Sequence, residues 1–238
     1  MVLALDRAGL VGPDGATHNG SYDIAYVRSL PRVNIMAPAD ATEMRDMLDL
    51  AIDSRTPCAI RYPRTNAPVP EAEYARTGRL VMGKSETLRR GRHVAILALG
   101  AMVYPCMDVC EMLERHGISA TLVNARFVRP LDREMLAEVL ETHPLVFTVE
   151  EHTVNGGFGS ACLEEAAKSR WAADRLVPIG LPGESFISHG TRLECLEEAG
   201  LDPEGIARQI VRAVEHDRNL RSAGADADVW TRSAEESY

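Results

Sequence analysis

Short apolar runs alternate with segments whose apolar residues recur every three or four positions along most of the chain. The short runs predict buried strands, and the longer spacing predicts helices with one apolar face. Because the runs are apolar throughout, they favour a mainly parallel sheet covered by helices on both faces. Predicted strands occupy 2–5, 33–36, 58–62, 94–99, 120–124, 145–149 and 176–179, and predicted helices occupy 21–29, 102–116, 132–143 and 158–168.

Helix starts are marked by capping residues. Asp40 precedes Glu43 by three positions, and Thr191 precedes Glu194 by three, which is the spacing of a capping box. Asp202 and Pro203 supply a cap and a first-turn proline before an apolar stripe. We therefore predict three further helices, each beginning at one of these caps.

Composition shifts divide the chain into segments. Residues 66–86 contain Pro68, Pro70 and Gly78 and few large apolar residues, which is typical of a linker. We therefore predict a first domain over 1–65, a complete second domain over 87–216 and a disordered polar tail over 217–238. Since the first strand opens the chain at once, we expect the N-terminal half of the first domain to be missing.

The composition is that of an ordinary folded protein: 45% of residues are hydrophobic, 26% are charged and the net charge is −9. An acidic surface repels phosphate backbones and anionic lipids, so we expect no nucleic-acid or membrane partner. The longest apolar run, 94–107, contains Pro105 and is shorter than the roughly 20 residues of a membrane span. Five cysteines without a C-x-x-C pair, and no leader, favour reduced core thiols and a cytoplasmic location.

The most unusual segment is a glycine-rich loop over 6–20, which follows the first predicted strand. Ligands bind at strand ends in open α/β sheets. Arg7 is suited to an anionic group, Asp14 to a hydroxyl and His18 to proton transfer. A solvated, turn-rich surface loop is an equally good interpretation of the spacing alone.

Two arginines, Arg61 and Arg64, flank Tyr62 and Pro63 at the end of the third predicted strand. Arginine matches phosphate geometry, so this pair predicts a phosphate site facing the same crevice. The alternative is an edge strand that ends at proline with exposed arginines.

A second glycine-rich turn, N-G-G-F-G-S, follows Glu150, Glu151 and His152. Its spacing matches neither of the common phosphate-binding glycine motifs, which favours a tight turn or a subunit contact. The acidic cluster has no second ligand group at a recognisable metal-binding spacing, so we predict no metal site. The roles of Glu150, His152 and His189 stay open.

The string D-R-A-G-L-V-G-P-D-G-A-T-H-N-G-S-Y-D resembles the pyrimidine-domain signature of the 1-deoxy-D-xylulose-5-phosphate synthase family. The resemblance continues through V-N-I-M-A-P-A-D, A-I-R-Y-P-R, A-R-F-V-R-P-L-D, T-V-E-E-H, N-G-G-F-G-S-A and F-I-S-H-G-T. It covers almost everything from Val2 to about Val214, in the family's order. It implies a partial transketolase-like pyrimidine-binding domain followed by a transketolase C-terminal domain.

The resemblance also implies an activity. That family uses thiamine diphosphate and Mg²⁺ to join pyruvate to glyceraldehyde 3-phosphate, with release of CO₂, for isoprenoid, thiamine and pyridoxal biosynthesis. By the same resemblance, Arg7, Asp14 and Arg64 bind substrate and His18 is catalytic.

The family's metal motif and its activating glutamate have no counterpart here, so we expect this chain to hold no cofactor and to be inactive alone. We expect a homodimer or a separate N-terminal chain as partner. G-L-P-G-E-S-F also departs from the family pattern near His189. Alternatives are a C-terminal subunit of a transketolase or 2-oxoacid dehydrogenase, and a non-catalytic association module.

Overall fold

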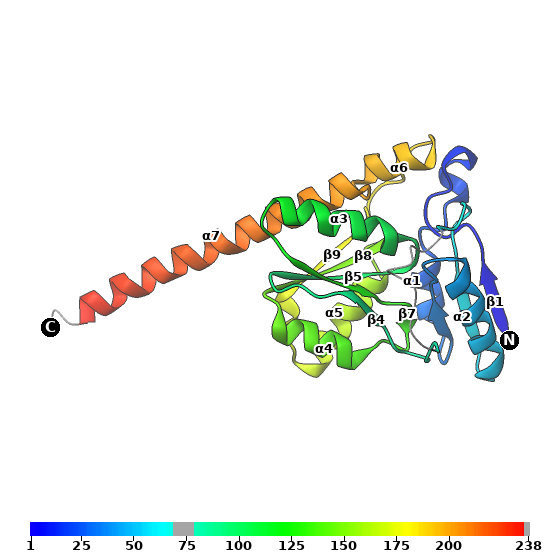
Figure 1. Ribbon diagram of the computed structural model, residues 1–238, viewed down its shortest axis with the longest axis horizontal. Coiled ribbons are helices and arrows are strands. Elements are labelled where there is room, and N and C mark those ends of the chain that lie inside the picture. Colours follow the sequence, from blue (N-terminus) through cyan, green and yellow to red (C-terminus); the bar gives the residue numbers. More distant parts are fainter. Residues whose placement is uncertain (69–78, 236–238) are drawn as a thin grey trace.

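The computed structural model describes residues 1–68 and 79–235, with side chains described as far as residue 219. Within these ranges the strands form two sheets (Figure 1). The first has the order β1-β3-β2-β7, with β1, β2 and β3 parallel and β7 antiparallel to β2. Its strands are β1 (Val2–Leu5), β2 (Asn34–Met36), β3 (Cys58–Arg61) and β7 (Phe127–Arg129). The stretch of chain from β1 to β3 also contains the helices α1 (Asp23–Arg28) and α2 (Ala41–Asp53).

The second sheet has the order β4-β6-β5-β8-β9 and is parallel except for the edge strand β4. Its strands are β4 (Glu86–Arg89), β5 (Val94–Ala98), β6 (Ala120–Asn124), β8 (Leu145–Thr153) and β9 (Leu176–Leu181). The helices that follow are α3 (Val103–Arg115), α4 (Arg133–Thr142), α5 (Phe158–Ser169), α6 (Arg192–Ala199) and α7 (Pro203–Glu235).

Helices cover both faces of this second sheet. Alternate residues of β5 enter different cores: Ile96 packs with α3 and α7, whereas Leu97 packs with α4 and α5. Figure 1 shows α3 and α7 on one side of the sheet and α4 and α5 on the other. The predicted α/β fold with a mainly parallel, two-sided sheet is confirmed.

Two strands and one helix differ from the sequence-based expectations. Strands β4 and β7 were not predicted, because E-T-L-R and F-V-R are short edge segments without a long apolar run. Glu86 begins β4, although we placed it in the linker; residues 69–78 of that linker lie outside the described ranges. Helix α7 continues to Glu235 where we predicted a disordered tail, and Figure 1 shows it extending away from the sheets. Ile206, Ile210 and Val214 anchor the first turns of α7 in the core, and a nucleated helix propagates at lower cost than a new helix forms.

The two parts of the chain are joined by main-chain pairing and by a buried ion pair. Strand β7 comes from the second part but completes the first sheet beside β2. Asp40 caps α2 as predicted, accepting from the Glu43 amide at 2.8 Å. The Glu43 carboxylate accepts from Ala39 N at 2.7 Å and from Arg126 Nε at 2.7 Å. A charged pair with little solvent access therefore ties α2 to the second sheet.

The remaining local predictions concern caps, cysteines and hydropathy. Thr191 and Glu194 form the reciprocal capping box at the start of α6, and α7 begins at Pro203, both as predicted. All five cysteines are buried free thiols. In the described ranges, the helices lack the combination of length and hydropathy that crossing a bilayer requires.

Candidate functional site

The loop over 6–20 and the segment after β3 meet at one edge of the first sheet. Because β1 and β3 are parallel, their carboxyl ends lie side by side. Ala8 N donates to Tyr62 O at 3.0 Å, which joins the base of the loop to the end of β3. Gly9 and Gly20 exchange main-chain hydrogen bonds of 3.0 and 2.9 Å, which close the neck of the loop.

Three of the predicted site residues come together at this edge. Arg64 donates a hydrogen bond from a terminal guanidinium nitrogen to Asp14 Oδ2. Arg7 Nε lies 3.9 Å from the same oxygen and is buried without a hydrogen-bond partner among the described residues. Both arginine side chains are otherwise substantially exposed, at 43% for Arg7 and 56% for Arg64. Asp6 Oδ2 also lies 3.9 Å from Arg7 Nε. The two guanidinium groups therefore face two carboxylates in a solvent-facing cluster of alternating charge.

His18 lies on the same loop but its ring points to a different partner. It ends the second of two short 3-10 turns, and its Nδ1 is 3.2 Å from Thr17 Oγ1. In the described part of the chain it forms no ion pair with Asp14. The ring is exposed. The loop thus carries an accessible imidazole four residues after Asp14, hydrogen-bonded to its neighbour Thr17.

A second histidine reaches this loop from the other part of the chain. His189 Nε2 donates to the Pro13 carbonyl at 3.0 Å. A Cβ on Gly15 would lie 3.8 Å from the His189 ring, so the ring packs beside the loop without crowding it. Sequence reasoning left His189 open because only tertiary contact brings it to Pro13.

Arg61 does not join the cluster, which corrects the prediction that both arginines face one phosphate site. Its side chain is buried, and its Nε donates to the Asp23 carboxylate at 2.9 and 3.2 Å. A terminal nitrogen also donates to Gly20 O and to Glu151 O, each at 3.2 Å. Strand β3 ends at Arg61, whose side chain turns into the core, whereas Arg64 lies in the loop beyond the strand and reaches Asp14.

The glycine-rich turn after β8 binds a carboxylate of the chain itself. Glu150 accepts from Phe158 N at 2.6 Å and Gly159 N at 2.8 Å, at the N-terminus of α5. Burial raises the pKa of Glu150 to about 7, although both hydrogen bonds act in the other direction. A Cβ on Gly157 would lie 2.3 Å from the same carboxylate, so glycine is required there. The arrangement agrees with the tight-turn interpretation.

The two residues that follow Glu150 are also engaged with main chain. Glu151 accepts from Leu10 N at 2.7 Å and pairs with Arg192. His152 Nδ1 donates to Thr153 O at 2.7 Å and its Nε2 accepts from Ala25 N at 3.3 Å. Burial lowers the pKa of His152 to about 4, so the ring is neutral at physiological pH. In the ranges described, no grouping of His, Cys, Asp and Glu is arranged to hold a metal ion.

A pocket of about 390 Å³ opens beside the arginine cluster. Pro63 and Thr65, which flank Arg64, form part of its wall, and Tyr104 donates to Asp40 at 2.9 Å in another part. The pocket therefore lies between the strand ends of the first sheet and the start of α3.

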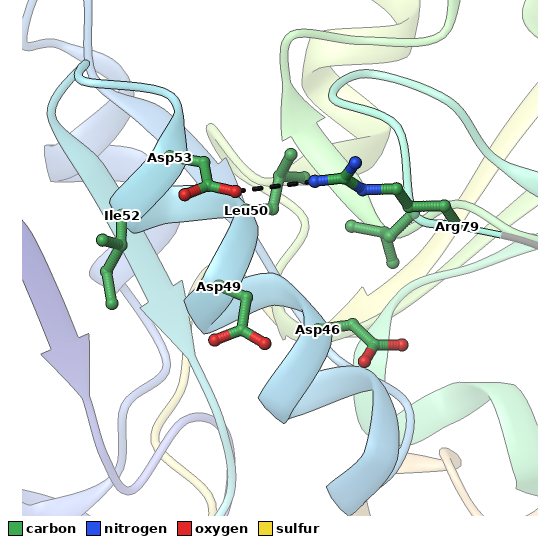
Figure 2. A pocket seen from close by; sticks show the side chains of 7 residues that line it. Asp46, Asp49, Leu50, Ile52, Asp53 and Arg79 are labelled. Carbon is green, nitrogen blue, oxygen red and sulfur yellow. Dashed lines mark ion pairs between the residues drawn. The ribbon is translucent and has the colours of Figure 1, made fainter.

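A second pocket, of about 460 Å³, contains none of the predicted site residues. Figure 2 shows Asp46, Asp49 and Asp53 along α2, with Arg79 opposite them. Arg79 pairs with Asp53 at 3.5 Å, and both side chains are well exposed. This is a solvated acidic helix face, and we assign it no ligand.

Comparison with known proteins gives the class. Residues 1–70 match the model of the transketolase pyrimidine binding domain, and residues 83–206 match that of the transketolase C-terminal domain. A solved split-gene transketolase, in an inactive β4 tetramer, shares 31% identity and a TM-score of 0.79 over 90% of this chain and 67% of that one. The chain belongs to the transketolase-like thiamine-diphosphate enzymes, a family of transferases.

Within that class, the curated relatives are 1-deoxy-D-xylulose-5-phosphate synthases. The chain is 48% identical over 215 residues to the synthase of Magnetococcus marinus, covering 88% of this chain and 33% of the relative. It is 46% identical over 226 residues to that of a Synechococcus species, covering 94% and 34%. The chain thus spans about a third of the length of these relatives. Transketolase from Pichia stipitis, with 23% identity and a TM-score of 0.70, shares the fold.

Proposed function

We propose that this chain supplies the C-terminal, substrate-facing portion of a 1-deoxy-D-xylulose-5-phosphate synthase. The reaction joins pyruvate to glyceraldehyde 3-phosphate with loss of CO₂. The observation that carries the proposal is the cluster of Arg7, Asp14 and Arg64 at one sheet edge. It occurs in a chain whose curated relatives carry that name.

The cluster suits the phosphate of the triose substrate. Arg64 is an exposed guanidinium at a strand end, and guanidinium groups donate paired hydrogen bonds to phosphate oxygens. Arg7 adds a second positive charge from the neighbouring loop. Pyruvate lacks a phosphate, so we assign this cluster to glyceraldehyde 3-phosphate.

His18 is the group we assign to proton transfer. Its ring is exposed on the loop that carries Arg7 and Asp14. A positioned imidazole transfers protons effectively near neutral pH. In the proposed reaction it would act on the aldehyde oxygen of the triose, which must gain a proton as the new carbon–carbon bond forms.

The described residues do not fit a Mg²⁺–diphosphate site. Such a site needs oxygen atoms that are available to coordinate the metal ion. Asp14 is already engaged with two arginines, and the carboxylates of Glu150 and Glu151 are bound to main-chain amides. We therefore propose that thiamine diphosphate and its metal are held by residues outside this chain, either in a longer polypeptide or in a separate N-terminal partner. The cofactor supplies the reactive carbanion, so without it the side chains of this chain would have no reacting group to act on.

A second candidate is the C-terminal subunit of a split transketolase. The split-gene transketolase structure favours it, because the match covers 67% of that chain. Both candidates use a sugar phosphate, so phosphate binding alone does not separate them. The donor substrate separates them: pyruvate in one case and a ketose phosphate in the other.

A chimera tests the choice. Residues 2–216 of this chain would replace the matching third of the Magnetococcus marinus synthase, which supplies the remaining two thirds. We expect pyruvate and glyceraldehyde 3-phosphate to give 1-deoxy-D-xylulose 5-phosphate, identified by mass and NMR. Turnover of xylulose 5-phosphate with ribose 5-phosphate, and none with pyruvate, would favour the transketolase instead. The unmodified relative is the control for expression and cofactor loading.

A further inference from the structure

Glu151, from the C-terminal part of the chain, places one buried carboxylate against the loop over 6–20. Glu151 lies in β8, yet its Oε1 accepts from Leu10 N at 2.7 Å, with the side chain only 3% exposed. Gly9, beside Leu10, has a φ of +77°, and a Cβ there would lie 2.4 Å from Glu151 Cδ. The carboxylate therefore packs directly against the loop backbone, two residues after Arg7.

Arg192 extends this contact along the loop. As the first residue of α6, it pairs through a terminal nitrogen with Glu151 Oε2. Gly12 has a φ of +64°, and a Cβ there would lie 2.7 Å from Arg192 N. The stretch of loop between Arg7 and Asp14 thus rests on the Glu151–Arg192 pair.

The C-terminal end of the loop, at Gly20, is also connected to Glu151. Arg61 donates to Gly20 O and to the Glu151 carbonyl, each at 3.2 Å. Glu151 consequently contacts the beginning of the loop through its side chain and the end of the loop through its main chain and Arg61. Neither contact involves the ends of the Arg7, Asp14 or Arg64 side chains.

We propose that Glu151 is a positioning residue: with Arg192 it holds the loop in the conformation that brings Arg7 to the cluster that contains Arg64. The buried Glu151 carboxylate then contributes to phosphate binding without touching the ligand. This inference rests on the proposed function in one respect, namely that the arginine cluster binds phosphate. The positioning itself is independent of that assignment.

Two variants of the full chain test it, and the chain offers a matched control. Glu151→Ala removes both contacts, whereas Glu151→Gln keeps an oxygen acceptor for Leu10 N and loses the charge that holds Arg192. Glu150→Gln alters the neighbouring buried glutamate, which binds the start of α5 and not the loop. The measurements are hydrogen exchange of the Leu10 amide and titration with inorganic phosphate by NMR, well below each melting temperature.

We expect Glu151→Ala to lose Leu10 protection and to bind phosphate about tenfold more weakly, the scale of a charge-assisted hydrogen bond. Glu151→Gln is expected to fall between Glu151→Ala and the wild type, and Glu150→Gln to stay within about twofold of the wild type.

A folded Glu151→Ala with unchanged Leu10 protection and phosphate affinity would overturn the inference, as would an equal loss in Glu150→Gln. If Glu151→Ala does not fold, the same comparison is decided by Glu151→Gln. Failure of the wild-type chain to bind phosphate would contradict the proposed function, and the exchange data would still decide the positioning role.

Discussion

Asp14 accepts a hydrogen bond from Arg64 across the gap between two parallel strand ends, and the same carboxylate oxygen lies 3.9 Å from Arg7 Nε. Arg7 and Asp14 lie on the loop over 6–20, and Arg64 lies on the segment after β3. A phosphate that binds Arg64 has to compete with this internal carboxylate. The pair therefore sets the affinity of the proposed phosphate site.

Replacing Asp14 should strengthen phosphate binding. Asp14→Asn removes the competing charge, and a partly exposed ion pair is worth about 0.2–1 kcal/mol, so we expect inorganic phosphate to bind about 1.4- to 5-fold more tightly. NMR titration of the full chain measures this. Asp6→Asn is the matched control, because Asp6 also lies 3.9 Å from Arg7 but does not contact Arg64. Weaker binding by Asp14→Asn would mean that Asp14 orients Arg64 instead of competing for it.

Replacing His18 should slow turnover more than it weakens substrate binding. In the chimera with the Magnetococcus marinus synthase, we expect His18→Ala to lower kcat by about 10²–10⁴-fold, the usual contribution of a proton-transfer group. His189→Ala is the comparison, since that ring bonds the Pro13 carbonyl from outside the cluster. A raised KM with kcat intact would assign His18 to binding alone.

The free energy of unfolding should fall as pH rises, because of the buried Glu150 carboxyl group. Its pKa is raised by burial from 4.5 to about 7, so the folded state binds more protons than the unfolded state between these values. The contribution to the free energy of unfolding is complete below about pH 4.5 and is lost as pH rises through 7. A shift of this size corresponds to roughly 3 kcal/mol.

The free energy of unfolding of Glu150→Gln, relative to that of the wild type, should therefore increase as the pH rises from 5 to 8. Urea unfolding at several pH values measures the difference. Glu164→Gln, which removes a mostly exposed carboxylate from α5, is the control for the loss of one charge. A constant difference between Glu150→Gln and the wild type across this range would show that burial does not raise the Glu150 pKa.

The purified chain should bind thiamine diphosphate weakly and should not turn over substrate. The charged diphosphate needs a hard cation with free oxygen ligands, and the described carboxylates at the site are already bound. Calorimetric titration with thiamine diphosphate and Mg²⁺, followed by a decarboxylation assay with pyruvate, checks both expectations. Micromolar binding or turnover by the chain alone would contradict the assignment of the cofactor to residues elsewhere.

The sequence predicted most of the fold because its central strands are uninterrupted apolar runs and its helices carry clear caps. It did not predict β7, because F-V-R pairs with β2 only through a contact that is distant along the chain. Arg61 and Arg64 had equal standing on spacing alone, and the family resemblance pointed to Arg64. Only the burial of Asp23 beside Arg61 separates an inward structural arginine from an outward one. Glu151 carried no signal of its role, because its partners Leu10 and Arg192 are remote in sequence.

The kinetic effect of Arg64→Ala in the chimera tests the central claim most directly. The guanidinium at the end of β3 is proposed to bind a phosphate that pyruvate lacks. We expect the KM for glyceraldehyde 3-phosphate to rise by about tenfold or more, since hydrogen bonds to charged groups contribute about 1.5–3 kcal/mol, while the KM for pyruvate changes little. Equal increases in both KM values, or no increase in either, would contradict the account.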